Sequence, residues 1–325
     1  MRVLLTGAFG TIGTAALREL LHAGHQVRCL DLPSQAVKKA AREFEGRVEF
    51  VWGDICEPQA VARAVAGMGV VIHNAAIIPP LSEREPELAR RINVGGTNNL
   101  VVACEAQDPK PMLVFASSVS LFGIAQDQPP PRHVGEPVRP SDHYTHSKAE
   151  CEQILQASGL QWAILRFAAI GPTKVDLRSK YDRLAFFRLS PEVRIEVLHP
   201  NDAGLAEANA VCSEEVWGKI LLVGGGARCQ VRMRDFNRAF HEALGIGSLP
   251  DQAFGKEPYY TDWMDTDESQ RILRYQRCSY DDWARELSRS ARGLRILVRP
   301  LRPLLRRLML RQSPFYGHGP VTLDT

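Results

Sequence analysis

The stretch Thr6-Gly7-Ala8-Phe9-Gly10-Thr11-Ile12-Gly13 follows a short apolar run and precedes a segment with helical spacing. Gly7 permits a tight turn, Gly10 lets the backbone approach a pyrophosphate, and Gly13 lets the helix pack against the strand. The positive end of the helix attracts the anion. The stretch therefore predicts a dinucleotide-binding turn between a first strand and a first helix. The cofactor contacts expected in it are Gly7, Phe9, Gly10, Thr11, Ile12 and Gly13.

Outward from this turn, short apolar runs alternate with helically spaced segments through the first half of the chain. Short apolar runs of this length indicate buried strands. Their alternation with helices predicts an α/β fold: a doubly wound parallel Rossmann sheet, with a smaller C-terminal substrate-binding region. The expected strands are 3–5, 26–30, 48–51, 70–73, 112–116 and 162–166, and the expected helices are 15–23, 60–66, 89–105 and 147–157.

Two acidic residues follow the second and third expected strands. Asp31 lies 18 residues beyond Gly13, where a carboxylate accepts hydrogen bonds from the adenosine ribose hydroxyls. It would repel a 2′-phosphate, and no Lys or Arg occupies the next six positions, so the sequence favours NAD over NADP. Capping of the following turn is the alternative role. Asp54, with Ile55 beside it, is expected near the adenine amino group, although Asp after a strand is also ordinary turn chemistry.

A tyrosine and a lysine share one face at the start of an expected helix. Tyr144 and Lys148 are four residues apart in Tyr144-Thr145-His146-Ser147-Lys148. A phenol has a pKa near ~10, but an adjacent ammonium and an oxidised nicotinamide both favour the phenolate. Ser118, at the end of the fifth expected strand, is placed to hydrogen-bond the reacting oxygen, whereas Ser117 is expected to satisfy local backbone groups. The expected catalytic residues are therefore Ser118, Tyr144 and Lys148.

Together these motifs resemble the extended short-chain dehydrogenases/reductases, the group of the NAD-dependent epimerases/dehydratases and the 3β-hydroxysteroid dehydrogenase-like enzymes. The resemblance covers about residues 1–245. It includes His73-Asn74-Ala75-Ala76, Asn93-Val94-Gly95-Gly96-Thr97-Asn98, Arg166 before Gly171-Pro172, and His199-Pro200-Asn201-Asp202-Ala203. It implies that Asn74, Ala75 and Ala76 line the cofactor, that Asn93 supports the site, and that Lys148 also holds the nicotinamide ribose.

The segments that differ from this family narrow the reaction. Val119 and Ser120 follow Ser118, without the acidic pair that sugar 4,6-dehydratases use, so dehydration is disfavoured. The expected function is NAD-dependent hydride transfer at a secondary alcohol or ketone of a small molecule, with Tyr144 as acid/base. A nucleotide-sugar 4-epimerase is the alternative in the same class. A non-catalytic NAD-binding regulator is the alternative in another class, and the intact Ser118, Tyr144 and Lys148 argue against it.

The regular alternation stops after Gly171-Pro172. Residues 1–171 are expected to form the NAD-binding Rossmann domain, to which 194–223 return. The substrate-binding region is expected at 172–193 and 224–291. After residue 172 the sequence predicts isolated strands at 194–198 and 219–223 and a helix at 236–244. Two stretches, 126–142 and 250–267, have the composition of long loops, which near a site are often lids. Four acids between 262 and 268 (Asp262, Asp265, Asp267 and Glu268) lack calcium-loop spacing, so no metal is assigned, and helix capping by Thr266 or Asp267, or a lid, is expected instead.

The last expected unit is a basic amphipathic tail, residues 292–325. It contains seven arginines and no acid between 292 and 311, with leucines at helical spacing. Pro300 and Pro303 are expected to interrupt a continuous helix. Packing on its own domain and peripheral contact with a membrane are both left open for this tail, as is a homodimer for the chain.

The overall composition is that of an ordinary globular enzyme: 45% hydrophobic, 24% charged, and a formal net charge of +3. This charge is too small to indicate nucleic acid as a partner. The seven cysteines are scattered, without a C-x-x-C pair, which favours reduced thiols and a cytoplasmic location. The apolar run at the N-terminus is too short for a signal-peptide core, and no segment has the apolar length of a membrane span.

Overall fold

The computed structural model contains a seven-stranded parallel sheet with the strand order β3-β2-β1-β4-β5-β6-β9. Most of its strand residues are apolar, and the central strands are buried on both faces, as in parallel sheets covered by helices. The α/β class and the doubly wound parallel sheet are therefore confirmed. The strands are β1 (Arg2–Thr6), β2 (Gln26–Asp31), β3 (Glu49–Trp52), β4 (Val70–His73), β5 (Met112–Ser118), β6 (Trp162–Phe167) and β9 (Lys219–Val223).

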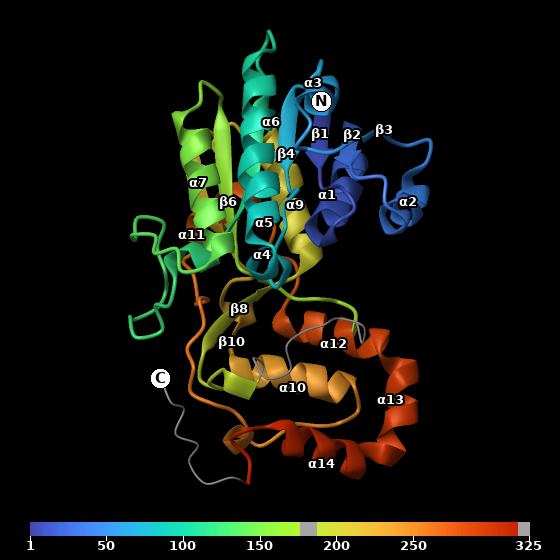
Figure 1. The fold of residues 1–325 in the computed structure, drawn as a ribbon, viewed down its shortest axis with the longest axis vertical. Coiled ribbons are helices and arrows are strands. Elements are labelled where there is room, and N and C mark those ends of the chain that lie inside the picture. Colours follow the sequence, from blue (N-terminus) through green and yellow to red (C-terminus); the bar gives the residue numbers. More distant parts are fainter. Residues whose placement is uncertain (176–186, 318–325) are drawn as a thin grey trace.

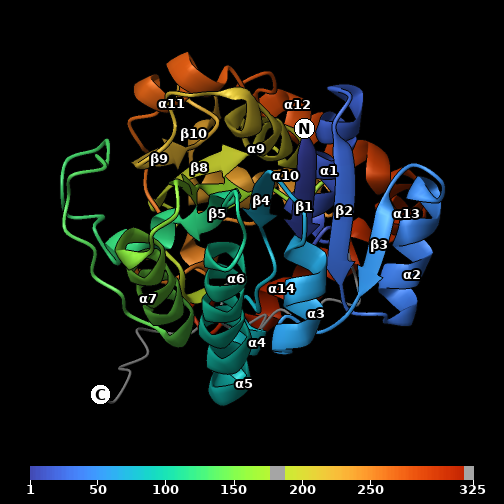
Figure 2. The same cartoon turned by 90° about the horizontal axis from the view of Figure 1, so that it is seen from above.

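Helices cover both faces of this sheet, and Figure 2 shows α9 and α6 on opposite sides of the strands. On the α9 face, α9 packs on α1 so closely that a Cβ atom on Gly204 would lie 2.7 Å from Ala15 Cβ. These strands and helices are called the sheet lobe below. The helices of one face are α1 (Thr11–His22) and α9 (Pro200–Cys212), and those of the other are α3 (Pro58–Val65), α6 (Gly96–Glu105) and α7 (His143–Ala157).

The strand order reverses beside β1. The chain runs outward from β1 to β2 and β3, then crosses to β4 on the other side of β1. In open α/β sheets, ligands bind where this reversal occurs, at the carboxyl ends of the strands. Those ends face the second lobe in Figure 1.

The second lobe, called the C-terminal lobe below, is built around a three-stranded sheet of order β10-β8-β7. Beneath it, Trp283 stacks on Phe236 at a centroid distance of 5.2 Å and joins α12 to α10. The elements of this lobe are β7 (Ala169–Ile170), β8 (Arg194–Leu198), β10 (Gln230–Arg232), α10 (Met233–Ala243), α12 (Tyr280–Ser290), α13 (Arg292–Val298) and α14 (Arg302–Gln312). A further helix, α11 (Asp267–Leu273), packs against α9 and β9 of the sheet lobe.

The expected return of residues 194–223 to the Rossmann unit is wrong in its first part. β8 pairs with β7 and β10 in the small sheet, because its partners are the strand just after β6 and the strand that leads into α10. The rest does return: α9 packs on α1, and β9 pairs with β6 as the last strand of the large sheet. The alternation of strands and helices therefore continues beyond residue 171.

Two helices differ from their expected bounds. α7 begins at His143 rather than at 147, because Asp142 and Thr145 form a capping box that starts the helix earlier. The expected helix 89–105 is divided into α5 (Pro86–Arg90), a π-helical turn (Arg91–Gly95) and α6. Such π turns are frequent at functional sites, and this one carries Asn93.

Both tail prolines interrupt the helix, as expected. Pro300 stands in the first turn of a short 3₁₀ segment (Arg299–Leu301), and Pro303 stands in the first turn of α14. The missing N–H of proline is tolerated at these positions, so each proline starts a new helical segment.

The structure describes residues 1–175 and 187–317. Parts of two expected units, 176–186 of the substrate-binding region and 318–325 of the tail, lie outside the described residues. Within the described ranges, no helix combines the length and the apolar character needed to cross a membrane. The remaining short helices are α2 (Gln35–Ala41) and α4 (Leu81–Arg84).

Candidate active site

The glycine-rich turn lies at the carboxyl end of β1, against the end of β4. Gly7 has a φ of +62°, and a Cβ atom there would lie 2.8 Å from the Ala75 backbone nitrogen. A Cβ atom on Gly13 would collide with the Gly7 carbonyl oxygen. The first N–H groups of any α-helix lack an intrahelical acceptor. In α1 the N-cap residue is Gly10, which has no side chain that could accept from them. The turn is therefore open to an anion at the helix N-terminus, where Thr11 and Ile12 lie.

Asp31 stands beside this turn at the end of β2. One carboxylate oxygen accepts a hydrogen bond from the Phe9 backbone N–H at 3.2 Å, and the other accepts from Leu32 at 2.8 Å. Burial raises the pKa of Asp31, while these two hydrogen bonds oppose the rise. The Leu32 contact shows that Asp31 caps the following turn, the alternative role, and its position also suits a ribose contact.

An aromatic group that the sequence motifs do not reveal flanks Asp31. Trp52 is opposite Asp31 in the register of β2 and β3. Phe50 stacks on Trp52 at 5.3 Å, and Phe9 lies 6.2 Å from Trp52. An aromatic residue paired with the acid at the end of β2 is the signal by which this group could have been found.

The predicted residues after β3 lie in a tight turn. Asp54 accepts a hydrogen bond from the Cys56 N–H at 2.9 Å, so it has the turn role that the sequence also allowed. Ile55 is buried against Gly96 at the start of α6, where a Cβ atom would lie 2.7 Å from the Ile55 side chain. Both residues are at the carboxyl edge of the sheet.

The segment after β4 is held in place by side chains on three elements. The Ala75 N–H donates to Thr6 Oγ1 at 3.2 Å. Both ends of the Asn93 amide are bound to the backbone of Ile77, at 2.7 and 2.9 Å, which favours a supporting role for Asn93. The Asn74 amide donates to Glu207 on α9 at 2.8 Å. Asn74, Ala75 and Ala76 are thereby fixed across from Gly7.

Beneath this segment, His73 links the first strand to the helices. Its ring nitrogens lie 2.8 Å from Thr6 Oγ1 and 3.0 Å from Thr97 Oγ1, and Thr97 donates to the Asn93 carbonyl at 2.6 Å. Burial, assisted by the charge of Lys148, lowers the pKa of His73 to about 3. His73 is therefore neutral at physiological pH and has a structural role.

The three predicted catalytic residues converge where β5 ends and α7 begins. Burial raises the pKa of the Tyr144 phenol, and the nearby Ser118 hydroxyl opposes this rise. The Lys148 Nζ lies 5.8 Å from the centroid of the Tyr144 ring and donates to the Ala116 carbonyl at 2.6 Å. Ser118 Oγ also lies 2.7 Å from Ser120 Oγ and accepts from the Ser120 N–H, so strand-end capping accompanies its place beside Tyr144.

Two carboxylates fix the helix turn that carries Tyr144. Asp142 accepts from the Thr145 N–H at 2.7 Å in the capping box. Glu83, on α4, accepts from the N–H groups of His143 and Tyr144, each at 3.1 Å. Carboxylates at a helix N-terminus are stabilised by the helix dipole. The loop after β4 is thus attached to the Tyr144 turn.

Two buried acids near Lys148 were not predicted. Glu152 forms a two-point ion pair with Arg166, at 2.7 and 3.0 Å, and accepts from the Ser117 hydroxyl at 2.6 Å. The prediction that Ser117 serves the backbone is therefore wrong, because a buried carboxylate is within its reach. Glu152 follows Lys148 by four residues on the same helix, which was the signal available in the sequence.

The second acid, Glu207, lies on α9 and is fully buried. Burial raises its pKa to about 8, opposed by the Asn74 hydrogen bond and the Lys148 charge. Within the described residues, Glu207 Oε1 and Asn74 Oδ1 have no hydrogen-bond partner. Nothing in its sequence pattern distinguishes Glu207 from a residue on a solvated helix face.

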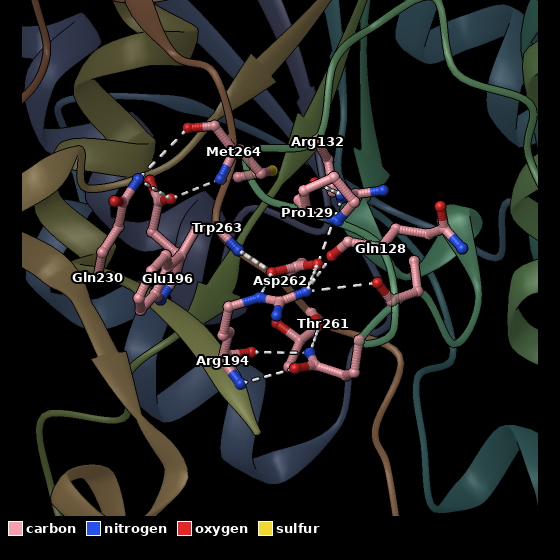
Figure 3. Close-up of polar contacts among 12 residues, drawn as sticks. Gln128, Pro129, Arg132, Arg194, Glu196, Gln230, Thr261, Asp262, Trp263 and Met264 are labelled. Atoms are coloured by element: carbon pink, nitrogen blue, oxygen red, sulfur yellow. Dashed lines mark hydrogen bonds and ion pairs between the residues drawn. The ribbon is translucent and has the colours of Figure 1, made fainter. Parts of the chain in front are cut away.

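Three of the four acids between 262 and 268 have separate basic partners. Figure 3 shows Asp262 between Arg194 and the loop that carries Arg132. Arg194 binds both Asp262 oxygens at 2.6 and 2.8 Å, and Arg132 Nε lies 3.3 Å from one of them. Asp265 pairs with His133 and Glu268 with Lys219. Thr266 occupies the N-cap of α11 but makes no side-chain cap, and its hydroxyl accepts from the Gln276 amide at 2.9 Å instead, so the expected cap by Thr266 is wrong.

These contacts tie the two long loops together over β8. The Arg132 N–H donates to the Trp263 carbonyl at 2.8 Å, and Gln126 accepts from the Arg194 N–H at 2.8 Å. The stretch between 261 and 264 is buried apart from a partly exposed Trp263. In the described part of the chain, no three His, Cys, Asp or Glu side chains are grouped as metal ligands would be.

The residues at the sheet edge fit a dinucleotide. The bare Gly10 and the open helix N-terminus suit a pyrophosphate, Asp31 suits ribose hydroxyls, and a Cβ atom on Gly7 would close the turn against Ala75. Tyr144 and Lys148 lie near the start of α7, and Ser118 lies at the end of β5, at the same edge. The geometry therefore accommodates a nicotinamide dinucleotide running from Asp31 toward Tyr144.

Comparison with known proteins agrees with this geometry. Residues 3–183 match the model of the NAD dependent epimerase/dehydratase family. Among curated proteins, 3 beta-hydroxysteroid dehydrogenase type 7 of Rattus norvegicus is 32% identical over 123 residues, 37% of this chain and 36% of that protein. UDP-glucose 4-epimerase of Lactobacillus helveticus is 30% identical over 183 residues, 54% of each chain. The matches thus span between about a third and a half of the relatives' length.

Solved structures resemble the whole fold. UDP-glucose 4-epimerase of Thermus thermophilus, in complex with NAD, superposes with a TM-score of 0.73 at 24% identity, covering 90% of this chain and 99% of that chain. A short-chain dehydrogenase/reductase superfamily protein of Agrobacterium tumefaciens with bound NAD has a TM-score of 0.74 at 18% identity, covering 93% and 100%. Both lobes of this chain therefore follow a known arrangement.

Proposed function

Because the chain belongs to the NAD dependent epimerase/dehydratase family, we propose that it is an NAD-dependent oxidoreductase that transfers hydride at a secondary alcohol or ketone, with Tyr144 as acid/base. The observation that carries the proposal is the convergence of Ser118 and Lys148 on Tyr144. Three unlike side chains from a strand end and a helix start meet at the edge where the glycine-rich turn opens. A non-catalytic NAD-binding regulator would have no need of this arrangement.

Tyr144 exchanges a proton with the substrate hydroxyl in this mechanism. Its phenol is partly buried, and burial raises its pKa, so it holds its proton in the absence of a nearby cation. The Lys148 ammonium beside the ring favours the phenolate. Bound NAD would accept a hydride from the carbinol carbon and add its own positive charge near the phenol. Ser118 is placed to hydrogen-bond the same substrate oxygen. This hydrogen bond would hold the substrate oxygen at a fixed distance from Tyr144.

The Lys148 ammonium is suited to stabilise the Tyr144 phenolate because few nearby groups neutralise its charge. Its Nζ donates to a carbonyl, that of Ala116, and burial lowers its pKa. Glu152 is already paired with Arg166, and Glu207 is protonated at neutral pH because its pKa is about 8. The ammonium charge is therefore available to Tyr144 and to a ribose hydroxyl of the cofactor.

A nucleotide-sugar 4-epimerase is the second candidate, supported by the similarity to UDP-glucose 4-epimerase along 183 residues. Both reactions use the same acid/base at Tyr144. They differ in whether reduced cofactor is released or the hydride returns to the other face of the same carbon. Retention of NAD through purification is expected of an epimerase and not of a dehydrogenase.

The test is a hydride-transfer screen with secondary alcohols, ketones and nucleotide sugars, following NADH absorbance and the configuration of the product sugars. Tyr144→Phe is expected to abolish turnover and to leave NAD affinity nearly unchanged, since one hydroxyl is lost and little packing. Tyr316→Phe removes the same group from an exposed tyrosine and is the matched control. Substantial turnover by Tyr144→Phe would place the acid/base elsewhere. NAD binding without turnover on any substrate would favour the regulator.

A further inference from the structure

The arginine-rich segment, residues 292–312, forms the outer rim of the C-terminal lobe. It comprises α13, the short 3₁₀ segment and α14, and Figure 1 shows α14 at the end of the molecule opposite the N-terminus and the central sheet. The segment contains seven arginines and no Asp or Glu. It therefore lies far from the candidate active site and has a single sign of charge.

One side of this segment is attached to the lobe. Arg302 Nε donates to the Ile246 carbonyl at 3.1 Å, and Arg306 donates to the Ser248 carbonyl. Met309 and Leu310 pack on a small apolar cluster that includes the buried Phe187. On this side the segment packs on its own lobe, which is one of the two alternatives left open by the sequence. The large apolar residues on the other side of the segment are exposed.

Five large apolar side chains of the segment point to solvent. Leu297 is 71% exposed, Ile296 66%, Leu304 56%, Leu301 52% and Leu308 43%. The four leucines, called the leucine stripe below, lie on three consecutive helical segments: Leu297 on α13, Leu301 in the 3₁₀ segment, and Leu304 and Leu308 four residues apart on one face of α14. The inward contacts leave these side chains uncovered, and exposed apolar side chains gathered on one segment mark an interaction surface.

The exposed arginines beside the stripe are also without acidic partners. None of the seven arginines forms an ion pair with a carboxylate within the described ranges. Elsewhere, exposed arginines such as Arg18, Arg271 and Arg285 pair with nearby acids. Among the described residues, four of the seven have exposed side chains that make no hydrogen bond: Arg292, Arg299, Arg307 and Arg311.

We propose that the arginine-rich segment docks on an anionic lipid bilayer, with the leucine stripe in the acyl boundary and the exposed arginines on lipid phosphates. Guanidinium groups bind phosphate in two-point geometry, and an amphipathic helix lies in the interface with its apolar side down. A symmetric contact between two copies would bring seven positive charges against seven. A nucleic acid would satisfy the arginines and leave the leucines in water. The bilayer is the partner that meets both features.

The test is co-sedimentation of the full chain with vesicles of phosphatidylcholine alone or mixed with phosphatidylglycerol, at low and physiological salt. Binding is expected only with phosphatidylglycerol and is expected to weaken with salt. Arg299→Gln/Arg307→Gln/Arg311→Gln is expected to lower the partition coefficient at least tenfold. The matched triple Lys38→Gln/Lys39→Gln/Arg42→Gln removes the same charge from the exposed α2 region and is expected to have little effect.

The apolar part is tested separately with single substitutions of equal exposure. Leu304→Ser, at 56% exposed, is expected to weaken binding several-fold, and Val102→Ser, at 57% exposed on the sheet lobe, is expected not to. Equal loss in the two triples would mean nonspecific charge attraction and would overturn the proposal. Loss in the arginine triple without loss in Leu304→Ser would also overturn it. A change of sedimentation coefficient in Leu304→Ser without vesicle binding by the unmodified chain would identify a second copy as the partner instead.

Discussion

In the sheet lobe, Lys148 is buried near Glu152, Arg166 and Glu207, whereas beside β8 Asp262 is buried between Arg194 and Arg132. Each cluster contains a carboxylate with a two-point arginine contact. Their charge balance differs. Around Lys148, Glu152 is matched by Arg166, and Glu207, with a pKa of about 8, is mostly protonated at neutral pH, so one positive charge is left over.

The cluster at Asp262 has no such surplus. Its two arginines face Asp262 and Glu136, since Arg132 also binds Glu136 at 2.7 Å. A balanced cluster joins loops where no regular ladder of hydrogen bonds exists, because removing any one member leaves an uncompensated buried charge. An unbalanced cluster costs folding free energy and is expected where a charge is used in chemistry. The difference separates a structural group from a functional one.

The largest effect is expected from removing the surplus charge itself. Lys148→Met keeps the length of the side chain but leaves Tyr144 without its cation, so turnover should fall by about 100- to 10,000-fold. The free energy of unfolding should stay the same or rise, because a buried ammonium without a carboxylate is replaced by an apolar group. Turnover and urea unfolding measure the two effects. A loss of several kcal/mol in stability would show that Lys148 is a structural partner after all.

The balanced cluster should respond in the opposite way. Asp262→Ala leaves two arginines facing each other without their shared carboxylate, and the free energy of unfolding should fall by about 3–5 kcal/mol. Glu136→Ala, which removes the more exposed acid, should cost less than about 1 kcal/mol. Urea unfolding followed by tryptophan fluorescence, to which Trp263 contributes, measures both. Equal effects of the two substitutions would argue that solvent reaches Asp262.

The ionisation of Glu207 sets the pH at which the unmatched positive charge of Lys148 is neutralised. The folded pKa of Glu207, about 8, lies above the usual value of 4.5, so its contribution to stability is fully present below pH 4.5 and is lost as the pH rises through 8. Between pH 6 and 8 the free energy of unfolding should fall by about 2 kcal/mol from this group. Glu207→Gln cannot ionise, and its advantage over the unmodified chain should grow by that amount. Parallel pH profiles of the two proteins would contradict the raised pKa.

The smallest effect is expected on cofactor affinity, from a substitution of Asp31. This residue is an acid without a basic partner at the edge of the sheet lobe. Asp31→Ala removes a carboxylate that is placed for ribose hydroxyls and should weaken NAD binding about tenfold, or about 1.4 kcal/mol. NADP binding should be unchanged or slightly tighter, because the repulsion of a 2′-phosphate is lost as well. Calorimetry with both cofactors decides, and Asp281→Ala, which removes an exposed acid of α12, serves as the control. Unmodified protein that binds NADP as tightly as NAD would refute the assignment.

The sheet lobe was predictable because its signals are local. The strands 70–73 and 219–223 have their expected bounds, and the other expected strands of this lobe differ by one or two residues at an end. Apolar runs and glycine spacing act within a few residues, so they are visible in sequence. What failed was also local in cause: Asp142 starts α7 earlier than the apolar pattern indicates, and a π turn interrupts the helix that contains Asn93.

The buried charges could not be predicted because they depend on contacts between distant segments. Asp262 meets Arg132 and Arg194 across 130 and 68 residues of sequence, respectively, and Asn74 meets Glu207 across 133. The run of acids near 262 favoured a helix cap over a metal site, but it did not identify the partner of any acid. The fold shows that Asp262, Asp265 and Glu268 each pair with a different basic residue. Tyr144 and Lys148 could be proposed from the sequence because their spacing on one helix is itself the signal.

The interleaving of the two lobes has a consequence for biosynthesis. As the chain leaves the ribosome, strands β1 to β6 are made first, and the strand that closes their sheet, β9, follows only after β8 of the other lobe. Until residues 200–212 have emerged, the face of α1 that packs on Gly204 is bare and Asn74 lacks the carboxylate of Glu207. The nascent chain therefore completes its cofactor edge late, and a fragment that stops before Pro200 would expose the apolar side of α1 to chaperones.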